Sequence, residues 1–195
     1  RPHDRSIVNM ETLLKIDTAL FYFLNSTISN KVFDFFMPII TNQKFWEIPL
    51  VILCLSMVIF GNKRARITVI IGILAISTSD LLCTRVFKPL VNRPRPGYTL
   101  SNVRLLVGKG GKKGFPSNHA ANISAAMAVC MYFYRRYKYG FFAIAVLVSF
   151  SRVYVGAHYP LDLIAGACIG CLISVILIEF WRLMAKRIRS LNVTV

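Results

Sequence analysis

The segment Pro160–Met184, with the sequence PLDLIAGACIGCLISVILIEFWRLM, decides the fold class. It carries no charged residue between Asp162 and Glu179. An α-helix of about 20 apolar residues crosses the roughly 30 Å hydrocarbon core of a bilayer, and this segment is long enough to do so. It therefore predicts a transmembrane helix.

Four further apolar segments precede it along the chain. They are Trp46–Phe60, Ile67–Leu82, Ser117–Tyr134 and Phe141–Val155, of which the first is short and is expected to extend at both ends. Hydrophobic residues make up 55% of the 195 residues and the mean hydropathy is +0.56, which is too apolar for a soluble domain of this size. The pattern predicts an all-α fold, a polytopic membrane helix bundle of about five transmembrane helices.

The N-terminal part of the chain differs from these segments. The stretch from Leu13 to Ile40 is apolar but repeatedly interrupted by polar residues, which predicts one or two amphipathic helices at the membrane interface, with a sixth span as the alternative. Residues 1–9 precede the first methionine, Met10, and are interpreted as a remnant of expression or processing. Residues 10–195 are then expected to form a single membrane-embedded domain.

The short loops predict the orientation of the bundle. Basic residues cluster in Lys63–Arg66, Arg135–Lys138 and Arg182–Arg189, which the positive-inside rule assigns to the cytoplasm. The loop from Cys83 to Phe115 and the turn at Ala157–Tyr159 then face outward. That outer loop has eight basic residues of its own, which conflicts with the rule. We base the orientation on the short loops, because some basic residues of the long loop have a chemical role that accounts for their position.

The charge distribution narrows the class of ligand. The net charge is +16, yet no basic helix, aromatic-interleaved sheet or zinc spacing supports nucleic-acid binding. Between Asp80 and Asp162 there are twelve Lys or Arg and no acidic residue. This interval suits anionic headgroups or a phosphorylated substrate, and it lacks the carboxylates of a Mg²⁺ or Ca²⁺ site. We expect no metal and no cofactor.

The cysteines and the glycine-rich stretch are given structural interpretations. The five cysteines are odd in number and lie in or beside apolar segments, so no structural disulfide is expected. Cys168 and Cys171 are interpreted as small residues that pack against another helix. The stretch Gly108–Gly114 lacks the spacing of a P-loop and is interpreted as a mobile basic loop near the headgroups.

Three polar clusters border the apolar segments on the predicted outer face. They are Lys88 with Arg95-Pro96, then Pro116-Ser117-Asn118-His119, and then Ser151-Arg152 with His158 and Asp162. Together they supply three cations, two imidazoles and one carboxylate, which are the groups needed to move a phosphoryl group.

Local patterns suggest how some of these residues act. Ser117 is predicted to cap the following helix, whose free backbone N–H groups would bind an anion. Asp162 follows His158 by four residues and is expected to accept its ring N–H and fix the tautomer. Arg93 is interpreted either as a further phosphate ligand or as a headgroup contact. Asp80 is interpreted as a structural partner of Arg85 or Arg152, with a proton route as the alternative.

The three clusters resemble the signature motifs of the type 2 phosphatidic acid phosphatase superfamily. The matching patterns are K-x6-R-P from Lys88 to Pro96, P-S-x-H from Pro116 to His119, and S-R-x5-H-x3-D from Ser151 to Asp162. They occur in order and border successive predicted membrane helices. One departure is Asn118, at a position where the family usually has glycine. Asparagine tolerates left-handed or capping conformations, so the site is expected to survive.

The resemblance implies a role for each matching residue. Lys88, Arg95 and Arg152 would hold the phosphate oxygens, with hydrogen bonds added by Ser117 and nearby backbone amides. His158 would attack phosphorus to form a phosphohistidine, and Asp162 would orient it. His119 would be the general acid for the leaving oxygen and then the base that activates water.

The resemblance also implies a membrane lipid phosphatase, a metal-independent hydrolase of a phosphoric ester or anhydride. The compact chain resembles the bacterial lipid A 1-phosphatase branch, in the inner membrane with the site on the periplasmic face. Undecaprenyl diphosphate and phosphatidylglycerol phosphate remain alternative substrates, and a transporter that binds lipid phosphate without cleaving it is a further alternative. The expected partners are the phosphorylated lipid substrate and membrane lipids; the oligomeric state is left open.

Overall fold

The regular elements in the described part of the chain are helices. The computed structural model describes the backbone of residues 2–192 and the side chains of residues 10–188. The side chains of residues 1–9, the predicted remnant, therefore lie outside the described residues. The main helices are α1 (Pro2–Tyr22), α2 (Lys31–Thr41), α3 (Gln43–Ile59), α4 (Lys63–Leu82), α5 (Lys88–Val91), α6 (Pro96–Thr99), α7 (Asn118–Phe133), α8 (Lys138–Tyr154) and α9 (Pro160–Asn192).

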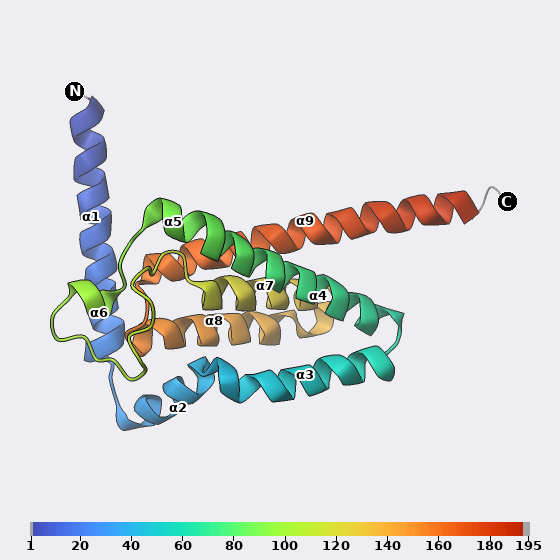
Figure 1. Cartoon of the computed structure of the whole chain (residues 1–195), viewed down its shortest axis with the longest axis horizontal. Coiled ribbons are helices and arrows are strands. Elements are labelled where there is room, and N and C mark those ends of the chain that lie inside the picture. Colours follow the sequence, from blue (N-terminus) through green and yellow to red (C-terminus); the bar gives the residue numbers. More distant parts are fainter. Residues whose placement is uncertain (1, 193–195) are drawn as a thin grey trace.

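Helix α7 lies in the middle of a bundle formed with α3, α4, α8 and α9 (Figure 1). It packs mainly against α9, α4 and α8. Helix α1 stands across one end of this bundle, and the long connection between α5 and α7 lies at the same end (Figure 1). The arrangement leaves the turn between α3 and α4 at the opposite end.

Four of the five predicted apolar segments coincide with a helix to within four residues, and the fifth, Pro160–Met184, begins with α9 but ends before that helix does, at Asn192. A π-helical turn, η2 (Cys83–Phe87), joins α4 to α5, so one helical run extends over Lys63–Val91. This run and Pro160–Ile188 are each long and apolar enough to cross a membrane, and α2 with α3 forms a third candidate that is bent by 54°. Helices α7 and α8, with 16 and 17 residues, are shorter than the about 20 residues of a full span.

The N-terminal stretch forms two helices, α1 and α2, which agrees with the expectation of one or two. A π-helical turn, η1 (Phe23–Thr27), ends α1, and the Asn30 side chain caps α2 by accepting the Phe33 N–H. Helix α2 ends at Thr41, where the chain bends into α3.

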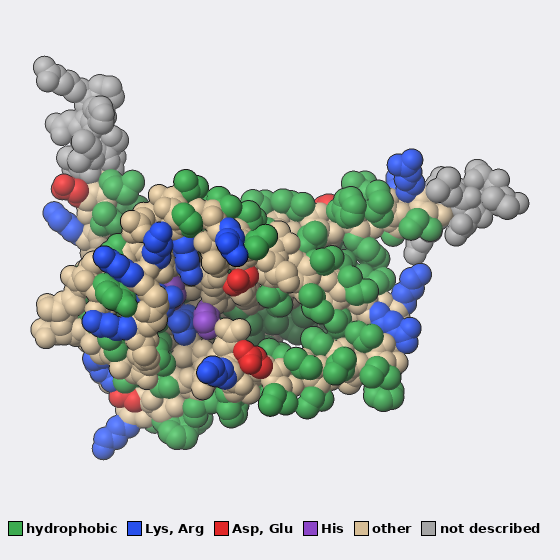
Figure 2. Space-filling model, viewed as in Figure 1, with side chains coloured by type: hydrophobic (Ala, Val, Ile, Leu, Met, Phe, Trp, Pro, Cys, Tyr) green, Lys and Arg blue, Asp and Glu red, His purple; other side chains and the backbone are tan. Residues whose placement is uncertain are grey.

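The outside of the bundle is apolar over most of its length (Figure 2). No residue of α3 is buried, and large side chains such as Ile48 and Phe60 are exposed. Exposed apolar surface on this scale is a feature of proteins that contact lipid. Basic side chains gather at the two ends (Figure 2).

Glycines bring α9 close to α7. A Cβ atom on Gly166 would lie 2.5 Å from the Ser117 carbonyl oxygen, and one on Gly170 would lie 2.1 Å from that of Ala121. One turn further along, the Ser174 hydroxyl donates to the Ala125 carbonyl at 2.9 Å. This small-residue contact sets the distance between the start of α7 and the start of α9.

Cys168 and Cys171 do not make this contact. Both are exposed, so the interpretation that they pack against another helix is wrong. Gly166, Gly170 and Ser174 recur every four residues and share the face toward α7, whereas the two cysteines fall on other faces of the helix. All five cysteines are free thiols.

We expect Gly170→Ala to destabilise the protein and to lower its activity. The added Cβ would meet backbone rather than a movable side chain, so α7 and α9 must separate; overpacking of this kind costs about 1–3 kcal/mol. Thermal unfolding in detergent should therefore begin several degrees lower. The matched control is Gly72→Ala in α4, where a Cβ meets nothing within 4 Å. An equal effect of the two substitutions would contradict this account of the interface.

Candidate active site

The three predicted clusters meet at the end of the bundle beside α1. The cations Lys88, Arg95 and Arg152 interact electrostatically with both His119 and His158. In Figure 2 histidine side chains are visible in a hollow of the surface, with Lys and Arg side chains around it. The fold thus brings residues from all three clusters together in one place.

The second cluster starts α7. The Ser117 hydroxyl caps the helix by accepting the Ala120 N–H at 3.4 Å, as predicted. The Ser117 backbone N–H donates to the Asp162 carbonyl at 3.0 Å and ties this helix start to α9. His119 follows in the first turn, half-buried. No hydrogen bond to its ring is made by the described residues.

Asn118 sits in regular helix. The non-glycine residues with positive φ in the described chain are Asn92 and Asn102, so tolerance of a left-handed conformation is not what admits asparagine at this position. Its side-chain amide donates to Asp80 Oδ1 and to Thr84 Oγ1, each at 2.7 Å, and so links α7 to the α4–α5 run.

Asp80 is held by amides. Besides Asn118, the Asn122 side chain donates to Asp80 Oδ1 at 3.1 Å. Among the described residues Asp80 forms no ion pair with Arg85 or Arg152, so its interpretation as their structural partner is wrong. The sequence did not reveal that α7 offers two amides on one face, four residues apart.

The third cluster ends α8 and turns into α9. Gly156 makes the turn with φ +82°, and a Cβ there would lie 2.5 Å from the Arg104 carbonyl oxygen. His158 is 2% exposed, and its Nδ1 lies 3.4 Å from Asp162 Oδ2. The predicted His–Asp pair is present, and it leaves Nε2 as the ring nitrogen available for chemistry.

Arg93 pairs with two carboxylates, and was expected instead to be a phosphate ligand or a headgroup contact. It donates from Nη1 to Asp162 Oδ1 at 2.9 Å and from Nη2 to Asp17 Oδ2 at 2.6 Å. Asp17 belongs to α1 and is 2% exposed. A buried acid in an apolar segment is costly and seldom idle, so the position of Asp17 in such a segment was the signal that could have pointed to this contact.

Two of the three site cations have a buried N–H without an acceptor. These are Nε of Arg95 and Nε of Arg152, although Nη1 of Arg152 donates to Thr41 Oγ1 at 2.6 Å. Leaving a buried donor unpaired costs free energy, and an oxyanion would supply the acceptor. Lys88 adds a third cation to the same cluster.

The stretch Gly108–Gly114 is tied to the first cluster. The Gly114 N–H donates to the Arg93 carbonyl at 2.7 Å, and the Arg95 N–H donates to the Lys112 carbonyl at 3.0 Å. A Cβ on Gly114 would lie 3.0 Å from Arg95 Cγ and 3.2 Å from Asp162 Oδ2. The interpretation of this stretch as a mobile basic loop near the headgroups did not include these contacts, which place the buried Gly114 beside Arg95 and Asp162.

The surroundings of His158 keep its ring neutral. Burial is the main cause that lowers the pKa of His158 well below its ordinary value, and the cations Arg95, Arg152 and Lys88 lower it further. At pH 7 the ring is therefore neutral, and a proton on Nδ1, which faces Asp162, puts the lone pair on Nε2. A neutral imidazole, three cations and a second imidazole can together bind a phosphate ester and displace its leaving group.

Comparisons with known proteins agree with this arrangement. A model described as the PAP2 superfamily matches residues 49–186. A lipid A 4′-phosphatase from Bacteroides thetaiotaomicron is 37% identical over 83% of this chain and 75% of its own length. A lipid A 1-phosphatase from Rhizobium johnstonii is 32% identical over 49% of this chain and 41% of its own length. The crystal structure of Aquifex aeolicus LpxE superposes with a TM-score of 0.69 at 26% identity, covering 83% of this chain and 94% of that one.

Proposed function

Because the chain belongs to the PAP2 superfamily and is a membrane lipid phosphatase, we propose that it hydrolyses a phosphate ester of lipid A. The 37% identity to a 4′-phosphatase extends over most of both chains, whereas the match to a 1-phosphatase covers less than half of each. The 4′-phosphate is therefore the first candidate, in place of the 1-phosphate that the sequence alone suggested. The 1-phosphate is the second.

The observation that carries the proposal is the pair of unpaired Nε donors beside a neutral His158. Arg95 and Arg152, with Lys88, would bind the phosphate oxygens and stabilise the charge of the transition state. Ser117 accepts the Ala120 N–H through its hydroxyl oxygen, so its O–H proton remains available and would donate to the phosphate. The free first-turn backbone N–H groups of α7 would add further hydrogen bonds.

The reaction would proceed in two steps. In the first, the bound phosphate anion offsets the surrounding cations and favours a protonated His119. His158 Nε2 attacks phosphorus, the phosphorus–oxygen ester bond breaks, and the His119 imidazolium gives its proton to the leaving oxygen. In the second, His119 takes a proton from water as the water oxygen attacks phosphorus. The nitrogen–phosphorus bond breaks, its electron pair returns to His158, and phosphate leaves. Asp162 holds the ring of His158 throughout.

The test is a side-by-side assay of substrates. Purified protein is offered lipid A that carries both phosphates, undecaprenyl diphosphate and phosphatidylglycerol phosphate, and the released phosphate and the remaining lipid are both measured. We expect lipid A to lose its 4′-phosphate first. Preferred hydrolysis of undecaprenyl diphosphate or phosphatidylglycerol phosphate would overturn the assignment of lipid A as the substrate. Binding without release from any of them would favour a transporter.

We further propose five spans, formed by α3, the α4–α5 run, α7, α8 and α9. The shorter α7 would lie inside the bundle, among α4, α8 and α9. Helix α8, with exposed side chains such as Phe142 and Val146, would face lipid on its outer side. At the end opposite the site, Arg64, Arg135 and Arg136 lie beside a group of aromatic residues, which suits a cytoplasmic interface. These aromatic residues are Tyr132, Phe133, Tyr134, Tyr137 and Trp181. The site would then face the periplasm from the inner membrane.

Cysteine labelling checks this orientation. In a background without the five native cysteines, a cysteine at the exposed Lys112 should react with a membrane-impermeant thiol reagent in intact spheroplasts. A cysteine at Lys63, which is also exposed but lies at the other end, should react only after lysis. The reverse pattern would overturn the topology.

Activity should persist in excess EDTA. Three cations already offset the phosphate charge, and no group of three or more His, Cys, Asp or Glu that could hold a metal occurs among the described residues. Vanadate, which resembles phosphate, should inhibit. Loss of activity in the chelator, with recovery on adding Mg²⁺, would contradict the proposal.

A further inference from the structure

The two oxygens of the Asp162 carboxylate have different neighbours. Oδ2 accepts the Tyr159 backbone N–H at 3.1 Å and lies 3.4 Å from His158 Nδ1. Oδ1 accepts a hydrogen bond of 2.9 Å from Arg93. The carboxylate is fully buried, so its orientation, and with it that of the His158 ring, depends on both sets of contacts.

Arg93 joins this carboxylate to a second buried one. Its other terminal nitrogen donates to Asp17 at 2.6 Å, and the side chains of Asp17 and Asp162 are 1% and 0% exposed. The guanidinium also lies over the Tyr159 ring, 4.1 Å from the ring centroid. A planar guanidinium presents N–H groups to two carboxylates at once, which a lysine ammonium does not reproduce.

Helix α1 reaches the site through Asp17. The second oxygen of Asp17, Oδ1, accepts the Leu161 backbone N–H at 2.8 Å, immediately before Asp162 in the first turn of α9. One turn along α1, the Phe21 ring packs 5.5 Å from the Tyr159 ring. Asp17 thus fixes both the arginine and the backbone that carries the carboxylate.

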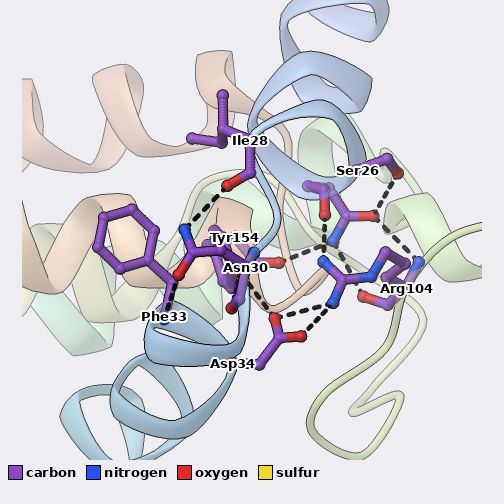
Figure 3. Close-up of polar contacts among 8 residues, drawn as sticks. Ser26, Ile28, Asn30, Phe33, Asp34, Arg104 and Tyr154 are labelled. Carbon is purple, nitrogen blue, oxygen red and sulfur yellow. Dashed lines mark hydrogen bonds and ion pairs between the residues drawn. The ribbon is translucent and has the colours of Figure 1, made fainter.

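A separate polar cluster anchors the chain that follows α1 (Figure 3). Asp34 accepts hydrogen bonds from Arg104 at 2.7 and 2.8 Å and from the Tyr154 hydroxyl at 2.6 Å. Asn25 donates to the Tyr154 and Arg104 carbonyls at 2.7 and 2.9 Å. This cluster holds α1 and α2 to the end of α8 and makes no contact with Asp162, so it provides a matched control.

We propose that Asp17 and Arg93 are positioning residues that hold the Asp162 carboxylate toward His158, so that α1 completes the catalytic arrangement. The inference rests on the proposed roles of His158 and Asp162. Arg93 occupies Oδ1 as a fixed cation, which reserves Oδ2 for the His158 Nδ1–H. The lone pair on Nε2 then points to phosphorus. Asp17 holds Arg93 in place and ties it to α9.

Arg93→Lys keeps the charge and removes the bridging geometry. We expect kcat to fall by about 10- to 100-fold, as for other groups that orient a catalytic side chain, with little change in KM. The rate of phosphoenzyme formation from an activated aryl phosphate should fall by the same factor. Asp17→Asn should slow the same step to a smaller extent. The double variant should be about as slow as Arg93→Lys alone, because both act through one carboxylate.

Arg93→Gln removes the charge and adds a second readout, the pH dependence of kcat/KM. The groups that face or neighbour the Asp162 carboxylate are Arg93, Arg95, His158 and Tyr159, and Asp17 pairs with the same Arg93. Without the Arg93 cation the carboxylate is less stabilised as an anion, so the acid limb should move to higher pH. Arg93→Lys should restore most of that shift while kcat stays low.

Asp34→Asn is the control, because it also removes a carboxylate charge from the N-terminal part of the chain, but in the separate cluster with Arg104 and Tyr154. It should lower thermal stability without slowing phosphoenzyme formation per folded molecule. If wild type itself forms no phosphoenzyme, the proposed chemistry fails. If wild type forms the phosphoenzyme and folded Arg93→Lys forms it at the same rate, the positioning role is overturned. That role is equally overturned if the Arg93 variants behave like Asp34→Asn.

Discussion

Replacing His158 by alanine is expected to abolish both turnover and the covalent phosphoenzyme. The ring is 2% exposed, and its Nδ1 faces Asp162 at 3.4 Å, so we expect Nε2 to be the nitrogen that attacks phosphorus. Its lowered pKa keeps that nitrogen unprotonated at pH 7. Removing a nucleophile costs on the order of 10⁶-fold in kcat, so no turnover should be measurable.

The measurement uses labelled substrate with an activated leaving group and an alkaline quench, because phosphohistidine survives base. His158→Gln should be equally inactive and preserves more of the buried volume than alanine, so it separates loss of the nucleophile from collapse of the site. Thermal unfolding of both variants serves as the check on folding. Base-stable phosphoprotein in His158→Ala would show that another residue is the nucleophile.

The positions of the main helices were predictable because hydropathy is a local property. The segments Ser117–Tyr134 and Phe141–Val155 correspond to α7 (Asn118–Phe133) and α8 (Lys138–Tyr154). Which face of a helix meets its neighbour is not local. Cys168 and Cys171 were small enough to pack against α7, but Gly166 and Gly170 do so, and hydropathy does not distinguish these faces.

The convergence of the three clusters was predictable because helices in a membrane alternate direction. Arg95 follows the α4–α5 run, His119 lies at the start of α7, and His158 lies in the turn from α8 to α9. These connections must then fall on one side. The connection from Asp17 through Arg93 to Asp162 was not predictable. Its partners are separated by 76 and 69 positions in sequence, and the contact requires α1 to cross the end of the bundle.

Removing His119 is expected to slow turnover in a way that depends on the leaving group. His119 lies in the first turn of α7, among Lys88, Arg95 and Arg152, and makes no hydrogen bond to a carboxylate of the described chain. Without an orienting partner of the kind His158 has, it suits proton transfer rather than attack. A general acid–base group is worth about 10²–10⁴-fold, and His119→Ala should lose that much with a lipid whose leaving group is an ordinary sugar hydroxyl.

An activated aryl phosphate needs little protonation as its bond to phosphorus breaks. His119→Ala should therefore still form the phosphoenzyme from it at a rate near that of wild type. Hydrolysis of the intermediate should be slow, because water then lacks its base, and the phosphoenzyme should accumulate. His119→Gln, which restores polarity without a titrating group, should behave like alanine. Equal losses with the aryl phosphate and the sugar phosphate would assign His119 to phosphate binding, and failure to accumulate the intermediate would remove its second role as the base.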